Sequence, residues 1–424
     1  MCAAAMRRAA LLAVLLRVST ALDNGLRLPP MAWSSWYGFT SNIDEALFHG
    51  IADGLVSSGL AAAGYTGVWM DDGYALPRDP VTRKVTVDAA LFPSGMRNLS
   101  DYMTARGLAL GVYTAVGQYT CLGYQPTQPK RPGSCGFEAI DAETYALDWN
   151  VSQVKDDGCG SCPAPGGFAA MRDALNATGR RVLFTIGGYN VATPGGEDFG
   201  AVANLWRVGP DLYSSQYAMW TDRLDRATTP AQLALLRPGA FPDPDFLEVG
   251  YSPRAPKGST QSALEQRSMF TMWAALPTGL TLSADTRAGS GGLDADALAT
   301  LTHAEVIAVN QDALVAPLRL VSNSSGLQVW RRPLASGALA LVFFHRGVDT
   351  SGPLPAPPAV REISAAWADL GIAPGARVAV RDLWDRVDLG VFTGSFAANV
   401  TQRDARLYVL TTEGAPRAGA AGFY

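Results

Sequence analysis

Short β-rich runs alternate with longer segments of helical periodicity between residues 28 and 316, and this alternation constrains the fold more than any other feature of the sequence. Parallel strands need long crossover connections, usually helices, and eight strand–helix units close into a barrel. The sequence therefore predicts an α/β fold that begins with a (β/α)8 TIM barrel. The runs interpreted as its strands are Met31–Trp33, Thr66–Met70, Ala109–Tyr113, Gln153–Lys155, Arg181–Ile186, Ala203–Trp206, Phe246–Val249 and Leu280–Leu282.

The pattern changes after "AVNQDALVAP", where helical periodicity gives way to β-branched and aromatic runs between Gly, Pro and Ser turns. Segments such as "LQVWRRPL", "ALALVFFHR" and "RVAVRDLW" are typical of antiparallel strands. The sequence thus predicts a C-terminal antiparallel β-sandwich domain. The predicted organisation is a signal peptide at 1–21, the catalytic barrel at 22–316, the β domain at 317–413 and a flexible tail at 414–424.

The N-terminus has the form of a secretory signal: Arg7 and Arg8, then an apolar run, then small residues ending at Ala21. An ordinary N-terminal helix is the alternative. Export would leave an even number of cysteines, Cys121, Cys135, Cys159 and Cys162, as expected for disulfides. Sequons at Asn98, Asn150, Asn176, Asn323 and Asn399 fit a glycoprotein that is secreted or sent to a lysosome or vacuole.

Composition excludes several classes of function. The net charge is −4 and no basic cluster is present, so the sequence lacks the positive charge that would bind the phosphate backbone of a nucleic acid. After the N-terminal segment no run of ~18 apolar residues occurs, so no membrane span is predicted. The sequence holds three histidines and one C-x-x-C pair, Cys159 to Cys162, which disfavours zinc. Structural disulfides are favoured there over a redox pair.

Acidic and aromatic residues recur at the carboxyl ends of the predicted strands. In a barrel these ends converge on one face, so residues far apart in sequence share a pocket. No histidine lies near them, which leaves carboxylates as acid, base or nucleophile, while the aromatics suit the apolar faces of a sugar ring. The residues are Trp36, Asp71, Asp72, Tyr113, Asp157, Arg207 and Asp211, with Asp243 and Asp245 just before the predicted seventh strand.

Each of these residues also has an ordinary structural explanation. A strand-end Asp is often a helix N-cap, Lys155 could be an ion-pair partner, and a tryptophan such as Trp36 is often core. An acidic cluster could instead hold Mg²⁺ or Ca²⁺, although Lys155 and Arg207 already supply positive charge. The joint pattern favours hydrolysis of a glycosidic bond by two carboxyl groups, and a separation of about 5–5.5 Å would indicate double displacement.

Seven motifs, in matching order and spacing, carry a family resemblance. The chain resembles secreted retaining α-galactosidases and α-N-acetylgalactosaminidases, the melibiase-like glycoside hydrolase family 27, from about residue 28 to about 411. The motifs are "PPMAWSSWYGF", "GYTGVWMDDGY", "LFPSGMRNLSDYMTARGLALGVYTAVGQYTC", "QVKDDGC", "LWRVGPD", "FPDPDFLEVG" and "VIAVNQD".

The resemblance implies roles for individual residues. Asp157 would be the nucleophile and Asp211 the acid/base, with Lys155 beside Asp157 providing a charge asymmetry between them. In a strand, Lys155 and Asp157 share one face and Asp156 points to the other. Cys121 and Cys159 match a family disulfide. The residues implied to contact substrate are Trp36, Asp71, Asp72, Tyr113, Lys155, Gly187, Arg207 and Asp245.

Three departures from the family pattern bear on specificity and stability. Asp156 stands where an aromatic is usual and would need a partner if buried. Ser41 and Gly73 replace a second family disulfide, which leaves Cys135 and Cys162 available to pair. In "LFTIGGYN", Ile186, Gly187 and Gly188 replace a Cys-Glu-Trp motif that reads the sugar 2-hydroxyl, which would leave room for a 2-acetamido group or for water.

Together these features predict a cofactor-independent, metal-free retaining exo-glycosidase that removes terminal α-galactose from oligosaccharides or glycoconjugates. An α-N-acetylgalactosaminidase is the alternative suggested by the two glycines. A catalytically silent galactose-binding protein is a second alternative, suggested by Asp156 and the altered fifth loop. A homodimer is compatible with this prediction.

Overall fold

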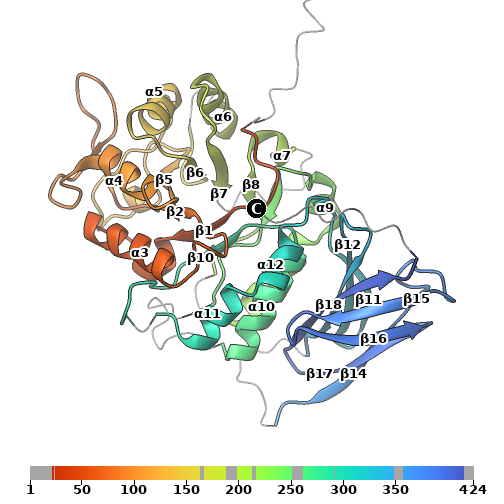
Figure 1. The fold of residues 1–424 in the computed structure, drawn as a ribbon. Helices are drawn as coiled ribbons and strands as arrows, with labels where there is room; N and C mark the ends of the chain where they lie inside the picture. Colours follow the sequence, from red (N-terminus) through yellow and green to blue (C-terminus); the bar gives the residue numbers. More distant parts are fainter. Residues whose placement is uncertain are drawn as a thin grey trace, which may run out of the picture.

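The computed structural model describes residues 22, 24–162, 167–187, 198–212, 216–250, 261–290, 292–347 and 357–414. The predicted signal peptide at 1–21 and residues 415–424 of the predicted tail lie outside these ranges. Two units follow one another along the chain, a barrel of alternating strands and helices and a module of antiparallel strands (Figure 1).

An eight-stranded parallel sheet forms the first unit, in the order β10-β1-β2-β5-β6-β7-β8-β9. A parallel bridge between Leu247 and Leu282 joins the segment after β9 to β10 and so connects the two edges. The predicted TIM barrel is therefore confirmed. Its strands are β1 (Met31–Ser34), β2 (Gly67–Trp69), β5 (Ala109–Ala115), β6 (Gln153–Asp157), β7 (Leu183–Gly187), β8 (Leu205–Arg207), β9 (Phe241–Asp243) and β10 (Leu280–Leu282).

Helices connect the strands and cover the outside of the sheet (Figure 1). Local sequence sets their ends: Ser262 and Glu265 form a reciprocal capping box at the start of α10. The helices are α2 (Trp36–Phe39), α3 (Glu45–Ser57), α4 (Gly95–Thr104), α5 (Glu138–Glu143), α6 (Phe168–Ala177), α7 (Phe199–Val202), α8 (Tyr217–Ala227), α9 (Pro230–Leu235), α10 (Ala263–Ala275), α11 (Ala295–Leu301) and α12 (Ala304–Asn310). Shorter elements are the strands β3 (Ala75–Leu76) and β4 (Thr86–Val87), the 3-10 turn η1 (Leu122–Tyr124) and the π turn η2 (Thr144–Asp148).

The seventh barrel strand lies earlier than the sequence predicts. It is Phe241–Asp243, paired with β8, whereas Phe246–Val249 was the predicted strand. Proline is rare inside strands, so Pro242 and Pro244 in "FPDPD" argued against a strand there. The apolar run "FLEV" that follows was therefore predicted as the strand instead. Asp243 therefore ends the strand and Asp245 follows it, rather than both preceding it.

Antiparallel strands make up the second unit. A six-stranded sheet in the order β11-β12-β13-β18-β15-β16 packs against the pair β14-β17, and ring stacking of Phe343 on Phe396 joins the two. This agrees with the predicted β-sandwich. Its strands are β11 (Arg319–Ser324), β12 (Leu327–Pro333), β13 (Leu339–His345), β14 (Val360–Ala366), β15 (Arg377–Asp382), β16 (Val387–Thr393), β17 (Ser395–Thr401) and β18 (Ala405–Thr412).

The two units share a buried interface. Arg332 of β12 is fully buried and donates to the carbonyl oxygens of Ala274, Ala275 and Val309 near the ends of α10 and α12. A cation at helix C-termini is favourable, because the last carbonyl groups carry partial negative charge. Phe344 stacks on Trp220 of α8 with ring centroids 5.8 Å apart. The sandwich thereby braces the helices on one side of the barrel.

Within the described ranges, no helix combines the length and apolarity needed to cross a bilayer.

Candidate active site

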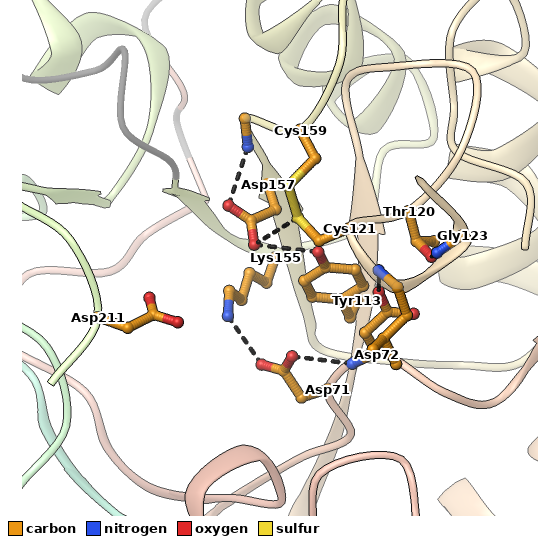
Figure 2. The surroundings of a disulfide bond; sticks show 12 residues. Asp71, Asp72, Tyr113, Thr120, Cys121, Gly123, Lys155, Asp157, Cys159 and Asp211 are labelled. Atoms are coloured by element: carbon orange, nitrogen blue, oxygen red, sulfur yellow. Dashed lines mark hydrogen bonds and ion pairs between the residues drawn. A yellow bond between two sulfur atoms is a disulfide. The ribbon is translucent and has the colours of Figure 1, made fainter. Parts of the chain in front are cut away.

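A cavity of about 220 Å³ opens where the carboxyl ends of the barrel strands meet. Its wall combines aromatic, acidic and basic side chains with a disulfide, and Figure 2 shows the acidic groups facing Lys155 from different sides. The lining residues are Trp36, Asp71, Tyr113, Cys121, Leu122, Gln125, Lys155, Asp157, Gly158, Cys159, Gly209, Pro210 and Asp211.

Asp157 ends β6, and its carboxylate is held on both oxygens. Tyr113 Oη donates to Oδ2 at 3.0 Å, and the backbone N–H of Gly158 donates to Oδ1 at 2.9 Å. Cys121 Sγ lies 3.4 Å from Oδ2, but it is part of a disulfide and has no proton to donate. Two donors therefore fix the direction of the carboxylate.

Lys155 lies two residues before Asp157 on β6 and pairs with Asp71 across the cavity. Its Nζ is 2.8 Å from Asp71 Oδ2. Burial alone would lower the pKa of Lys155, but Asp71, Asp157 and Asp211 outweigh it and hold the pKa above its usual value. The lysine therefore stays charged, and its direct contact is Asp71 rather than the neighbouring Asp157.

Asp211 follows β8 and lines the cavity, and Figure 2 shows it on the other side of Lys155 from Tyr113. Arg207 Nη1 is 3.2 Å from Asp211 Oδ1, while Arg207 Nη2 is 2.7 Å from the buried Asp245 Oδ2. The Asp211 side chain is 30% exposed, whereas that of Asp245 is 1% exposed. Arg207 thus bridges the buried carboxylate of Asp245 and the partly exposed carboxylate of Asp211.

Asp245 also accepts a hydrogen bond from Tyr37 Oη at 2.5 Å and one from the N–H of Leu212 at 2.8 Å. Burial raises the pKa of Asp245 to about 6, although Arg207 opposes the shift. The backbone at Asp245 has φ 84°, which L-residues rarely adopt. These contacts orient Arg207 and the chain beside Asp211 from behind the cavity wall.

The structure divides the implied substrate residues into two groups. Trp36, Asp71, Tyr113 and Lys155 line the cavity, as do Asp157 and Asp211. Asp72, Gly187, Arg207 and Asp245 are buried and stand outside the lining.

Asp72 supports a loop rather than the cavity wall. Its Oδ2 accepts from the N–H of Leu122 at 2.9 Å, and burial raises its pKa to about 7. Leu122 lines the cavity, so Asp72 acts on the site through the loop that carries Leu122.

Gly187 accommodates Asp157. A Cβ built on Gly187 would lie 2.9 Å from Asp157 Oδ1 and 3.5 Å from Arg207 Cγ. The space that the missing side chain leaves is therefore occupied by the carboxylate itself. Gly188, the second glycine of that argument, lies outside the described residues.

Asp156 faces away from the cavity and is 1% exposed. Its Oδ1 has no hydrogen-bond partner among the described residues. Burial, and then the charges of Asp157, Glu138 and Asp141, raise its pKa well above the usual value. The departure from an aromatic at this position has thus placed a buried carboxyl group with a raised pKa behind the site.

Two disulfides tie the β5–α5 connection to the segment after β6. Cys121 pairs with Cys159, as the resemblance implied, and Cys135 pairs with Cys162. Cys121, Cys159 and Asp157 lie close enough together to suggest a metal centre, but bonded sulfurs are not thiolate ligands. The disulfides stiffen the wall beside Asp157.

Sequence reasoning missed five residues of the site. Tyr37, Gly209 and Pro210 stand within "PPMAWSSWYGF" and "LWRVGPD", so their motifs contained the signal. Leu122 and Gln125 lie in "CLGYQPTQPK", where no motif marked them. Their place in the cavity wall depends on the folded loop, in which the N–H of Leu122 donates to Asp72.

Comparison with known proteins places this geometry in a family. The model of the α-galactosidase A family matches residues 28–312, and that of the α-galactosidase C-terminal β-sandwich domain matches residues 324–410. This chain belongs to the α-galactosidase A family. The membership inferred from the seven motifs is thereby confirmed.

Relatives within this family extend over nearly the whole chain. A probable α-galactosidase of Dictyostelium discoideum is 36% identical over 392 residues, which cover 91% of this chain and 93% of the relative. The α-galactosidase of Coffea arabica is 36% identical and covers 92% and 96%. Among solved structures, α-galactosidase I from Mortierella vinacea superimposes with a TM-score of 0.78 at 26% identity, covering 92% of this chain and 98% of that one.

Proposed function

We propose that this protein is an α-galactosidase that removes terminal non-reducing α-galactosyl residues by double displacement. One observation carries the proposal: Asp157 and Asp211, 54 positions apart in the numbering, line the same cavity at the carboxyl ends of the barrel strands. Family membership supports the galactosyl group as the substrate.

In the first step, Asp157 attacks the anomeric carbon and displaces the aglycone oxygen, which takes a proton from Asp211. A covalent galactosyl ester forms at Asp157 as the glycosidic bond breaks. In the second step Asp211 removes a proton from water, the water oxygen attacks the anomeric carbon, and Asp157 leaves as a carboxylate. Two inversions retain the α-configuration.

The other lining residues bind and orient the sugar. The Lys155–Asp71 pair offers an ammonium donor and carboxylate acceptors to neighbouring ring hydroxyls, and Trp36 and Tyr113 supply apolar walls. Tyr113 also holds Asp157 in its attacking direction. Arg207 and Asp245 hold the chain beside Asp211.

The cavity suits exo-action. Its volume of about 220 Å³ and its disulfide-braced wall leave room for one sugar ring rather than for a continuous chain. The galactose-containing substrate thus enters with its non-reducing end, and the remainder stays at the mouth.

A preference for N-acetylgalactosamine receives no support from Gly187, because Asp157 occupies the space beside it. A galactose-binding protein without turnover is disfavoured by the presence of both carboxyl groups in the cavity.

We also propose export, to the outside or to a lysosome or vacuole. Two disulfides in the described residues support this, since disulfides persist in oxidising compartments. The signal peptide, glycosylation, the homodimer and the lack of a cofactor remain predictions.

Rates on the 4-nitrophenyl α-glycosides of galactose and N-acetylgalactosamine test the proposal. We expect turnover of the galactoside to be favoured, and a ring-fluorinated galactosyl reagent to lose its anomeric leaving group and add one fluorogalactosyl mass to the peptide that contains Asp157. Turnover of the acetamido sugar alone would assign the other specificity. Binding without an adduct or turnover would indicate a silent lectin and overturn the mechanism.

A further inference from the structure

A pocket of about 390 Å³ lies where helices α10 to α12 of the barrel meet the β-sandwich, and it shares no residue with the active-site cavity. Figure 1 shows these helices beside the antiparallel strands. Small-molecule sites of about 300–1,000 Å³ occur preferentially at such boundaries. The lining comes from α10, α11, the N-cap of α12 and the β15–β16 turn, and consists of Ala263, Leu264, Arg267, Asp296, Ala299, Thr300, His303 and Trp384.

Trp384 forms the sandwich side of the pocket, and its indole is fixed in direction. Nε1 donates to Thr271 Oγ1 at 2.9 Å. Phe270 meets the indole edge-on with centroids 6.4 Å apart, and the His303 ring lies tilted against it at 4.8 Å. Trp384 nevertheless stays partly exposed. A preset ring loses little freedom when a ligand packs on it, so more of the contact energy remains as affinity.

His303 lines the pocket as a buried side chain, 5% exposed. Arg386 Nε donates to His303 Nε2 at 3.3 Å, so the ring proton is on Nδ1. Burial, and then the charge of Arg386, lowers the pKa of His303, which agrees with a neutral ring. Within the described ranges, neither His303 Nδ1 nor Arg267 Nε has a hydrogen-bond partner. Buried donors of this kind favour a ligand that brings acceptors.

The charges around the pocket are matched. Arg267 Nη2 lies 3.0 and 3.1 Å from the two carboxylate oxygens of Asp404, and Asp296 adds an exposed carboxylate. An anionic ligand would be repelled by Asp296 and would compete with Asp404, whereas a purely apolar ligand would leave the buried donors unpaired. The pocket therefore fits a neutral ligand with hydroxyl groups around an apolar C–H face, and a pyranose ring has this form.

We propose that this pocket is a second, non-catalytic saccharide site whose occupant is one pyranose ring of an oligosaccharide. Trp384 supplies the packing surface. Asp296 accepts hydrogen bonds from the ring hydroxyls, and Arg267 and His303 donate to them. Binding here is independent of the proposed reaction, since none of the residues of that reaction lines this pocket.

Fluorine NMR of the full chain, labelled with fluorotryptophan, tests the site directly. Trp384→Phe assigns the Trp384 resonance, and Trp36→Phe assigns that of Trp36 in the active-site cavity. At least one of galactose, glucose and mannose, each added alone, should shift the Trp384 resonance saturably, in the millimolar range expected for a single sugar ring. Asp296→Ala should weaken this affinity about two- to fivefold, roughly the worth of one hydrogen bond.

Asp369→Ala is the matched control and should keep the parent affinity, because Asp369 is also an exposed aspartate but stands outside the pocket. Asp71→Asn alters the active-site cavity and should leave the Trp384 titration unchanged. A Trp384 resonance that none of the three sugars shifts would overturn the site, as would equal affinities in Asp296→Ala and the parent. Loss of the shift in Asp71→Asn would make it an indirect effect of the active-site cavity and would overturn the site as well. The NMR titration needs no turnover, so its outcome is separate from the activity test of the proposed function.

Discussion

Strands β6 and β13 both lie between two neighbouring strands, yet they are built from opposite kinds of residue. β6, with the sequence QVKDD, carries three charged residues in its last three positions. β13, with the sequence LALVFFH, is buried at every position after the first and packs into both apolar cores. Burying charge costs free energy unless partners compensate. The charged residues of β6 therefore need compensating contacts, whereas the apolar residues of β13 do not.

Partners compensate in β6 at two of the three positions. Lys155 has Asp71, and Asp157 has Tyr113 and Gly158, whereas Asp156 Oδ1 has none among the described residues. β13 relies instead on ring contacts, with Phe343 stacked on Phe396 and edge-to-face with Tyr408. In the proposed mechanism Lys155 and Asp157 of β6 serve the reaction, whereas the apolar rings of β13 serve stability, and substitutions can test each half.

Asp157→Asn should have the largest effect. Removing the proposed nucleophile should lower kcat on an aryl α-galactoside by about 10⁴-fold or more, with little change in the midpoint of unfolding. Steady-state rates and thermal unfolding of the same preparation measure both. Asp156→Asn on the same strand is the matched control and should keep most of the activity, because Asp156 faces away from the cavity. Comparable losses of kcat in Asp157→Asn and Asp156→Asn would contradict a specific role for Asp157 in the reaction.

Phe343→Ala should produce the converse result. The ring is fully buried, so its removal should lower the free energy of unfolding by about 3–5 kcal/mol and leave kcat per folded molecule unchanged. Denaturant unfolding and active-site titration measure the two quantities. Val391→Ala, at a position 43% exposed on β16, should change neither. A large fall in kcat per folded molecule would show that β13 acts on the site.

Gly187→Ala tests how tightly β6 is packed against its neighbour at the site. The added methyl group would lie 2.9 Å from Asp157 Oδ1 and must displace the carboxylate, so kcat should fall roughly 10- to 100-fold. Gly375→Ala is the matched control, since nothing lies within 4 Å of a Cβ there. Unchanged kinetics in Gly187→Ala would mean that Asp157 can shift without loss.

Asp156→Asn should have the smallest effect, visible as a dependence on pH. The folded pKa of Asp156 is raised, so the folded state binds more protons than the unfolded chain above pH ~4. This contribution to stability is complete below the unfolded pKa and is lost as pH rises, by up to about 1.4 kcal/mol per pH unit for one group.

The Asn side chain does not titrate, so the variant should lose less stability than the parent between pH 4.5 and pH 6.5. Asp72 and Asp245, whose pKa values are raised to about 7 and about 6, keep part of the slope in both proteins. Denaturant unfolding at several pH values measures the difference. If the free energy of unfolding depends on pH in the same way in Asp156→Asn and in the parent, Asp156 is ionised in the folded protein.

Most of the barrel could be predicted from local pattern. Seven of the eight strand assignments overlap the observed strands, because a strand buried on both faces reads as an apolar run. The exception is β9, where two prolines hid the strand and a buried apolar run followed it. Proline is tolerated in β9 because this strand is the last in the sheet order and pairs with β8 alone, and hydrogen bonds join the chain around β8 to Phe241 and Asp243, on either side of Pro242.

The candidate site was predictable in its chemistry but less so in its contacts. Alternation along β6 put Lys155 and Asp157 on one face and Asp156 on the other, which the cavity lining matches. The ion pair of Lys155 with Asp71, the use of the space at Gly187 and the support of Leu122 by Asp72 join residues from different strands. Local pattern carries no information about such contacts.

The sequence by itself determined the barrel, the β domain and the acidic residues at the strand ends, because each depends on residue type and on spacing along one segment. Only the tertiary structure decided which acids reach the cavity, which cysteines pair beyond the family disulfide, and that the Asp157 carboxylate fills the space beside Gly187. Those outcomes depend on distances between segments that the closed sheet brings together, and these distances arise only when the core has packed.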